Sequence, residues 1–330
     1  MPARGAPLPP GWHPERIVPM LSVVVPVKDE EEAIAPFVTS VAPILTALAG
    51  TAWEILFVDD GSTDMTVPAI AAARARCGQV RMLSLSRNFG KEAALSAGLD
   101  HAAGDAVVPM DVDLQDPPEV LHEMVERWRE GHDVVYGIRR SRSSDRATKR
   151  ITAGMFYRAH NWLSRDKIPE HAGDFRLLDR KVVDVIRAMP ERNRFMKGLF
   201  AWGGFRQVGV EYDRVEREVG RTKFNYWTLW TLALDGITSS STMPLRVWSY
   251  VGGAVALLAL AYAVVVVIDT LVFGSQPQGY PSLVVSVLFL GGVQLISLGV
   301  LGEYVGRILI EAKGRPLYVV RDTLGFDGDN

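Results

Sequence analysis

Short apolar runs recur along the first half of the chain and are separated by segments with a helical pattern. The runs are mainly apolar, and the first of them is continuous and rich in β-branched residues, which is typical of a strand buried on both faces of a parallel sheet. They cover Leu21–Pro26, Trp53–Val58, Val80–Leu85, Ala106–Met110 and Asp133–Gly137. Helices are predicted between them, over Glu30–Ala49, Lys91–Ala103 and Pro117–Glu130. This alternation predicts a doubly wound, mostly parallel α/β sheet within residues 20–222.

Two much longer apolar runs lie near the C-terminal end. Val247–Ile268 and Pro281–Gly302 each extend for 22 residues without a charged side chain. About 20 apolar residues are enough to cross the hydrocarbon core of a bilayer. Between them, Asp269 is the single charged residue of positions 247–302. We therefore expect a hairpin of two transmembrane helices over residues 244–310.

Basic residues flank this hairpin on one side only. Arg246 precedes the first run, and Arg307, Lys313 and Arg315 follow the second, whereas residues 269–280 contain no Lys or Arg. The positive-inside rule then places both ends of the hairpin in the cytoplasm. We predict a protein integral to the cytoplasmic membrane, with the α/β domain, both termini and a tail over residues 311–330 on the cytoplasmic side.

The two remaining segments have their own patterns. Residues 1–19 contain six prolines and no apolar run, so we expect a flexible arm and not a signal peptide. In residues 223–243, Trp227, Trp230 and Leu234 recur at three- and four-residue steps. Because tryptophan favours the headgroup level of a membrane, this pattern predicts an amphipathic helix at the interface. A helix in the protein core is the alternative.

Overall composition excludes several classes of protein. The formal net charge is −2, and a chain that ends in a membrane hairpin is not expected to bind nucleic acid. Cys77 is the one cysteine, which excludes an internal disulfide framework and a multi-cysteine zinc site. No glycine-rich phosphate loop or Rossmann dinucleotide motif follows the first predicted strand.

Acidic side chains follow the second and fourth predicted strands, where an open α/β sheet binds its ligands. Asp59 and Asp60 form one pair, and Asp111 and Asp113 form the other. Carboxylates two residues apart in an extended segment project to one side. Their hard oxygens suit Mg²⁺ or Mn²⁺, which keeps substrate phosphates as further ligands. A solvated acidic turn is the alternative reading of Asp111 and Asp113.

Basic residues are concentrated between Arg139 and Lys167, where nine Lys or Arg side chains stand against two acidic ones. Such a segment can hold a phosphate group or meet anionic lipid headgroups. Arg139, near the end of the fifth predicted strand, and Arg150 or Lys149 are the candidates for phosphate binding in this segment, and the family resemblance described below favours Arg139. A solvated charged face is the alternative.

Six motifs occur in order along the chain: VVVPVKDEEE, VDDGSTD, LSRNFGKEAALSAGLDHA, DVDLQDPP, AGDFRLLDR and NRFMKGLFAW. Together they resemble the family-2 glycosyltransferases of the polyisoprenyl-phosphate branch over roughly residues 20–310. The resemblance implies a GT-A, Rossmann-like fold and a divalent cation, Mg²⁺ or Mn²⁺. It also implies inverting transfer of a sugar, with glucose expected, from a UDP-sugar to undecaprenyl or another polyprenyl phosphate.

The resemblance also implies roles for individual residues. Pro26, Glu30, Asp59 and Asp60 would bind the nucleoside, Asp111 and Asp113 the diphosphate and metal, and Gln115 would be a further metal ligand. Asp174 would be the catalytic acidic residue, acting with Asp113. Arg217 and Lys223, in a segment that resembles a mobile R-x-x-G-x-S-K loop, would close over the diphosphate. Lys28 and Asp29 depart from the family pattern, which often has an aromatic residue and an asparagine there.

Several alternatives stay open at this point. The sugar could be mannose, an N-acetylhexosamine or an aminoarabinose derivative, and the acceptor another lipid such as diacylglycerol. A non-catalytic membrane scaffold is the alternative from another class. A phosphate monoester has a second pKa of about 6, so the acceptor is largely ionised near neutral pH and needs no strong base. We therefore expect Asp174 to orient substrate as much as to remove a proton. Glycines in the second apolar run also suit a homo-oligomer.

Overall fold

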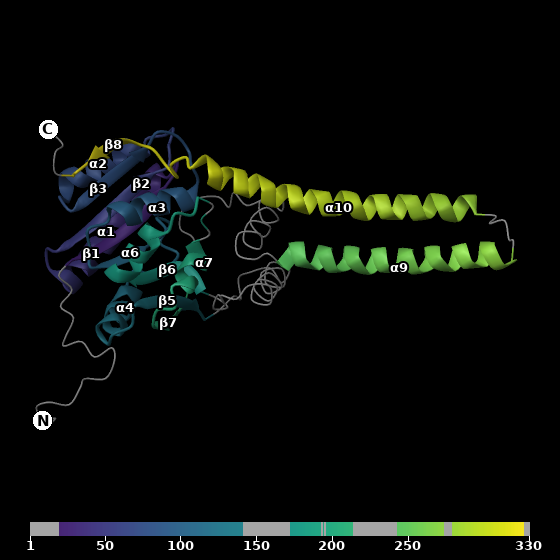
Figure 1. Cartoon of the computed structure of the whole chain (residues 1–330). Coiled ribbons are helices and arrows are strands. Elements are labelled where there is room, and N and C mark those ends of the chain that lie inside the picture. Colours follow the sequence, from purple (N-terminus) through teal and green to yellow (C-terminus); the bar gives the residue numbers. More distant parts are fainter. Residues whose placement is uncertain are drawn as a thin grey trace, which may run out of the picture.

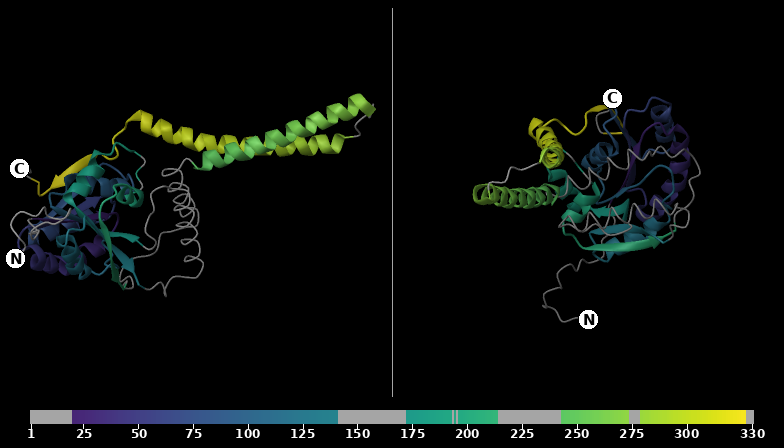
Figure 2. Two further views of the ribbon diagram at one scale, coloured as in Figure 1. Left: turned by 60° about the horizontal axis from the view of Figure 1, so that its bottom comes forward. Right: turned by 90° about the vertical axis from the view of Figure 1, so that its right-hand side faces the viewer.

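The computed structural model describes residues 20–140, 172–213 except 193 and 195, 243–273 and 279–326. An α/β domain forms the N-terminal part, and two long helices project from it side by side (Figures 1 and 2). The predicted arm over residues 1–19 lies outside the described residues. Almost all of the predicted interfacial helix over residues 223–243 does so as well.

Among the described residues, eight strands form one sheet in the order β7-β5-β6-β4-β1-β2-β3-β8. Their bounds are β1 Leu21–Val27, β2 Trp53–Asp59, β3 Val80–Leu85, β4 Ala106–Pro109, β5 Val134–Arg139, β6 Ala172–Asp179, β7 Gln207–Tyr212 and β8 Val320–Leu324. The pairs β4–β1, β1–β2, β2–β3 and β5–β7 are parallel. The predicted mostly parallel α/β sheet is confirmed, and the mixed sheet has the GT-A arrangement.

Helices cover both faces of this sheet (Figure 1). They are α1 Glu31–Ala49, α2 Thr66–Arg76, α3 Lys91–His101, α4 Val120–Arg129, α6 Arg180–Ala188 and α7 Met196–Trp202. Alternate residues of β1 divide the core, because Val23 and Val25 pack with α1, α2 and α4, whereas Val24 packs with α3, α6 and α7. The domain is therefore a three-layer α/β/α structure with a separate apolar core on each face of the sheet.

Strand β6 was not predicted, because Asp174, Arg176 and Asp179 interrupt any apolar run. Its alternation is nevertheless regular. Phe175 and Leu177 are buried in the core on one face, and Arg176 is buried with its guanidinium 4.1 Å from the ring centroid of Phe200. The strand runs antiparallel to both β4 and β5. Its first residues therefore lie at the carboxyl ends of its two neighbours, which brings Asp174 to the ligand-binding edge.

The two projecting helices are α9, Met243–Phe273, and α10, Tyr280–Lys313, and they contain the two predicted apolar spans. At 31 and 34 residues they are about 46 and 51 Å long at ~1.5 Å per residue, more than the ~30 Å of a bilayer core. None of the apolar stretch Phe289–Lys313 is buried. Large side chains such as Leu257 and Leu295 are likewise exposed. Lipid would satisfy this surface, so the helices indicate membrane association.

Helix α1 is also long and apolar enough to cross a membrane by composition. Its position shows another role, since Phe37, Val41 and Leu45 are fully buried in the core. The apolar composition of α1 thus reflects packing against the sheet. The contrast with α10 is one of burial, because the two helices have the same mean hydropathy of 1.5 over their apolar windows.

The segment after α10 returns to the α/β domain. Gly314, with φ of 58°, ends α10 in the left-handed conformation that favours glycine. Residues Val320–Leu324 then pair antiparallel with β3, and Met82 lies opposite Leu324. The sequence predicted only a tail over residues 311–330, because this short and largely polar strand carries no apolar run.

Candidate active site

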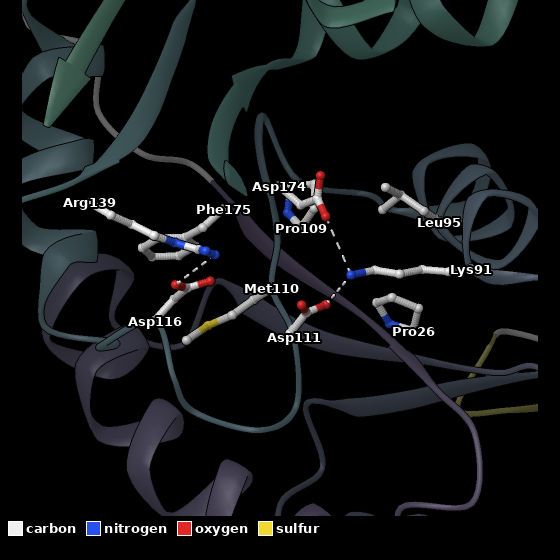
Figure 3. A pocket seen from close by; sticks show the side chains of 10 residues that line it. All are labelled: Pro26, Lys91, Leu95, Pro109, Met110, Asp111, Asp116, Arg139, Asp174 and Phe175. Carbon is white, nitrogen blue, oxygen red and sulfur yellow. Dashed lines mark hydrogen bonds and ion pairs between the residues drawn. The ribbon is translucent and has the colours of Figure 1, made fainter. Parts of the chain in front are cut away.

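A pocket opens at the carboxyl ends of β1 and β4, beside the start of β6 (Figure 3). Its lining residues are Pro26, Lys91, Leu95, Pro109, Met110, Asp111, Asp116, Arg139, Asp174 and Phe175. The chain passes from β1 to β2 on one side and places β4 on the other, so this edge is the topological switch point of the sheet. Ligands of open α/β sheets bind in such a crevice.

The pocket brings together Pro26, Asp111, Arg139 and Asp174, which the sequence analysis selected from four separate segments. It does not include Glu30, Asp59, Asp60, Asp113 or Gln115 in its lining. Arg150, Arg217 and Lys223 lie outside the described residues. The predicted roles of all these residues stay predictions. Of the predicted residues that the structure describes, four line the pocket and five do not.

Lys91 joins the two carboxylates of the pocket (Figure 3). Its ammonium nitrogen lies 2.7 Å from Asp111 Oδ1 and 3.5 Å from Asp174 Oδ2. The three side chains are between 37% and 49% exposed, so a ligand can reach them. Burial acts to lower the pKa of Lys91, but the charges of Asp111 and Asp174 outweigh it and raise that pKa above its usual value. Lys91 is therefore a cation at neutral pH.

The sequence analysis did not select Lys91. It is the first residue of α3 and lies within the motif LSRNFGKEAALSAGLDHA. The available signal was its place at the start of a helix, between the two acidic pairs in the sequence. That signal did not distinguish a pocket cation from an exposed helix residue, because the ion pair with Asp174 joins residues 83 positions apart.

Asp60 fixes the loop that leads to Lys91. Its Oδ1 accepts a hydrogen bond from the amide of Phe89 at 2.7 Å, and its Oδ2 accepts one from Gly90 at 2.9 Å. Burial raises the pKa of Asp60, and these two backbone donors partly offset the effect. Gly61 allows the close approach, because a Cβ there would lie 2.7 Å from the Arg87 backbone. In this structure Asp60 therefore stabilises the loop before α3 through these two backbone hydrogen bonds.

Asp59 is fully buried beneath the end of β2. Its Oδ1 accepts from the amide of Ser62 at 2.9 Å, and its Oδ2 accepts from the hydroxyl of Ser84 at 2.8 Å. The carboxylate therefore orders the turn between β2 and α2. Sequence reasoning could not separate this role from ligand binding, because both place an acidic residue directly after a strand.

The loop between β1 and α1 rests on the same turn. Asp29 has φ of 53°, which is unusual for a residue with a side chain. Its amide donates to Ser62 Oγ at 2.9 Å, and its Oδ1 accepts from the amide of Thr63 at 2.8 Å. The amide of Glu30 donates to Thr66 Oγ1 at 2.9 Å. These contacts explain the aspartate at position 29, because its carboxylate accepts a backbone hydrogen bond from the neighbouring turn.

Arg139 is held at the opposite side of the pocket by Asp116 and Tyr212. The Tyr212 hydroxyl donates to Asp116 Oδ1 at 2.5 Å, and Arg139 Nε donates to the same hydroxyl at 3.3 Å. Burial, followed by the charge of Asp116, raises the pKa of Tyr212 to about 12. Gly137 makes room for the tyrosine, since a Cβ there would lie 2.5 Å from the Tyr212 ring. Neither Asp116 nor Tyr212 was selected from the sequence.

The segment after β4 carries the predicted metal ligands. Val112 is buried between Asp111 and Asp113, and Asp113 Oδ1 accepts from the amide of Gln115 at 3.3 Å. No cluster of three or more His, Cys, Asp or Glu side chains suited to a metal occurs among the described residues. Two carboxylates fit a Mg²⁺ or Mn²⁺ ion whose other ligands come from substrate phosphates. The contact with Lys91 shows that Asp111 attracts a cation.

With this geometry in place, residues 22–187 match the family model of glycosyl transferase family 2, and residues 243–308 match the GtrB C-terminal hairpin. The chain belongs to glycosyl transferase family 2. This membership confirms the resemblance drawn from the six motifs, including the hairpin that follows the α/β domain.

Curated relatives cover almost the whole chain. This chain is 54% identical over 302 residues to a bactoprenol glucosyl transferase of Shigella phage SfV. The match covers 92% of this chain and 98% of that relative. The chain is 53% identical to a prophage bactoprenol glucosyl transferase homolog of Escherichia coli K12, with 91% and 98% covered. An uncharacterized glycosyltransferase of Synechocystis sp. is 52% identical, with 93% and 96% covered.

Solved structures are more distant. The glucosyl-3-phosphoglycerate synthase of Mycobacterium tuberculosis, in complex with Mn²⁺, UDP-glucose and phosphoglyceric acid, has a TM-score of 0.47 and 23% identity. That match covers 70% of this chain and 83% of the other.

Proposed function

We propose that this protein transfers a sugar, with glucose expected, from a UDP-sugar to undecaprenyl or another polyprenyl phosphate at the cytoplasmic face of the membrane. The observation that carries the proposal is the 54% identity to a bactoprenol glucosyl transferase over 98% of that relative's length. The identity includes both the α/β domain and the hairpin. The arrangement of charges in the pocket supports the same reaction.

The two kinds of charge in the pocket suit the transfer of a sugar between two phosphates. The acceptor phosphate oxygen attacks the anomeric carbon, the bond from that carbon to the diphosphate breaks, and UDP leaves with inversion. Lys91 and Arg139 supply positive charge on opposite sides of the pocket. Preorganised cations of this kind stabilise charge as it develops on a leaving or attacking phosphate.

Asp111 and Asp113, with Gln115 as a further ligand, would hold the divalent cation, Mg²⁺ or Mn²⁺. When bound, that ion supplies charge neutralisation for the leaving diphosphate. Asp174 lies across Lys91 from Asp111, so it orients the lysine. An acceptor phosphate that is largely ionised near neutral pH has little need of a base. We infer that Asp174 positions Lys91 and the acceptor.

The return of the chain to the sheet supports an orientation in which both ends of the hairpin are cytoplasmic. Strand β8 follows α10 and pairs with β3 of the same domain that precedes α9. Both ends of the hairpin then lie on the side of the α/β domain. The basic residues Arg246, Arg307 and Lys313 at these ends favour the cytoplasm. Impermeant thiol labelling of Ser275→Cys in a Cys77→Ser background should occur from outside the cell.

The activity is tested with the purified full-length protein. It would be incubated with radiolabelled UDP-glucose, undecaprenyl phosphate and Mg²⁺ or Mn²⁺, and label would be measured in the chloroform phase. We expect label to enter that phase only when the acceptor is present. Failure with UDP-glucose and with other nucleotide sugars would overturn the proposal, and success with another sugar would correct the donor.

Asp174→Asn separates positioning from proton removal. If Asp174 positions Lys91, turnover should fall by a similar factor across the pH range. A defect that disappears as the pH rises would instead indicate a base. Asp184→Asn is the matched control, because Asp184 lies on α6 with 55% of its side chain exposed and forms ion pairs with Arg180 and Arg187 at the surface. Such pairs contribute little.

A further inference from the structure

Strand β8 contacts β3, next to Asp59, one of the residues predicted to bind the donor nucleoside. Strand β8 lies beside β3 at the edge of the sheet (Figure 1). Two contacts attach the segment before it, because the amide of Ser86 donates to the carbonyl of Val319 at 2.8 Å and the Tyr318 hydroxyl donates to Asp100 at 2.8 Å. The segment that follows the membrane hairpin is therefore seated on the α/β domain over several residues.

A side chain of β8 begins a continuous series of hydrogen bonds. Arg321 donates from its guanidinium to Ser84 Oγ at 3.0 Å. The Ser84 hydroxyl donates to Asp59 Oδ2 at 2.8 Å. The other oxygen of Asp59 accepts from the amide of Ser62 at 2.9 Å, and Ser62 Oγ accepts from the amide of Asp29 at 2.9 Å. Five residues from four separate segments thus form one path.

The direction of these bonds gives Arg321 its effect. A serine hydroxyl has one proton and can also accept. Because Arg321 has no acceptor, it must be the donor, and Ser84 directs its proton to Asp59. Hydrogen bonds to charged groups are the stronger ones, and a guanidinium that polarises the hydroxyl strengthens its bond to the buried carboxylate.

The path ends in a loop that needs support. Asp29 has a positive φ of 53°, a conformation that costs free energy for a residue with a side chain. The loop that contains it joins β1, whose Pro26 lines the pocket, to α1. Loosening the turn at Ser62 would let this loop relax away from the crevice where ligands of such sheets bind.

We propose that Arg321 is a positioning residue for the donor nucleotide, which it supports through Ser84, Asp59 and the loop around Asp29. Strand β8, which follows the membrane hairpin, would thereby contribute to donor binding. This inference rests on the proposed function, since it takes a UDP-sugar as the ligand of that loop.

Kinetics of the full-length protein in detergent test the inference. Arg321→Ala should raise the donor KM, and the Kd for UDP, by about 5- to 10-fold, the size expected for one lost hydrogen bond in a charged network. The acceptor KM and kcat should stay within about twofold of wild type, since the groups that meet the acceptor are on β5 and β6. Arg321→Lys keeps a donor for Ser84 and should restore part of the affinity.

Two further variants make the path itself testable. Ser84→Ala removes both the bond from Arg321 and the bond to Asp59, so its donor defect should be at least as large as that of Arg321→Ala. The double variant Arg321→Ala/Ser84→Ala should be no worse than Ser84→Ala alone, because the connection is already broken. Arg315→Ala is the matched control: it removes the same charge from an exposed position between α10 and β8, and its donor KM should be unchanged. Melting temperatures of all variants are measured in parallel.

The outcomes distinguish the inference from the proposed function. A wild-type protein that uses a UDP-sugar, with a donor KM unaffected by Arg321→Ala, would overturn the inference alone. If Arg321→Ala weakened donor and acceptor binding by the same factor and also lowered the melting temperature, Arg321 would have only a structural role. That result would also overturn the inference. A wild-type protein that binds no UDP and forms no lipid-linked sugar would overturn both.

Discussion

The two acidic pairs at the strand ends look alike in the sequence and differ in the structure. Asp59 and Asp60 are buried, and each of their oxygens accepts a hydrogen bond from the protein. In the second pair, Asp111 is more than a third exposed, lines the pocket and contacts Lys91. The first pair orders the loops around the crevice, and the second provides charge within it. An acidic residue at the end of a strand can therefore either stabilise the loops that form a site or provide charge within the site.

The largest effect expected from this contrast is that of Asp111→Asn. The change removes a charge that both Lys91 and a divalent cation would meet, so turnover should fall by about 10³-fold, the upper size of one lost electrostatic contact in a preorganised site. The melting temperature should change little, because Asp111 is partly exposed. Asp184→Asn should retain full turnover. Equal turnover in the two variants would contradict the assignment of Asp111 to the site.

Lys91→Met should have the next largest effect. The thioether keeps most of the length of the side chain and removes the charge, so we expect turnover to fall by about 10²-fold. Lys91→Arg keeps the charge and should recover part of the activity. The control is Arg129→Met, an exposed position on α4. If Lys91→Met raised turnover instead, the lysine would be an inhibitor of metal binding and not part of the reaction.

Asp60→Ala tests the other half of the contrast. It removes the acceptor of the partly buried Phe89 amide, whereas the Gly90 amide keeps Asn88 Oδ1 as an acceptor at 3.0 Å. The loss should cost about 1 to 2 kcal/mol of folding free energy. The melting temperature of the purified protein should fall, and Asp60→Asn should lower it less because one oxygen remains. If Asp60→Ala kept the wild-type melting temperature and lost only UDP affinity, Asp60 would be a ligand-binding residue and not one that stabilises the loop.

The sequence predicted much of the fold because its signals were local. The five strands β1 to β5 are mainly apolar runs, and their alternation with helices predicted the mostly parallel sheet. Strands β6, β7 and β8 were not predicted. In β6 and β8, polar residues face specific partners, such as Arg176 on Phe200 and Arg321 on Ser84. Such partners are set by the tertiary structure and leave no periodic signal.

The residues of the candidate site were also predicted only in part. Asp111, Arg139 and Asp174 were predicted from strand ends and motifs, and the pocket brings them together. Lys91, Asp116 and Tyr212 were missed because their roles depend on contacts over long sequence separations, 96 residues for Tyr212 and Asp116. The sequence also could not distinguish Asp111 from Asp59, because they differ in exposure and in hydrogen-bond partners, and both depend on the tertiary structure.

The smallest effect concerns the group that holds Arg139. Tyr212→Phe removes the hydrogen bond to Asp116, which should lower stability by about 1 kcal/mol at neutral pH. The pKa of Tyr212 is raised to about 12 from its usual value of about 10, so the folded protein keeps this proton where the unfolded chain has lost it. The stabilising contribution is therefore complete below about pH 10 and is lost as the pH rises to about 12.

The difference in melting temperature between wild type and Tyr212→Phe should shrink over that interval. A difference that does not change with pH would show that the phenol makes no such bond, and Arg139 would then be held by Asp116 alone.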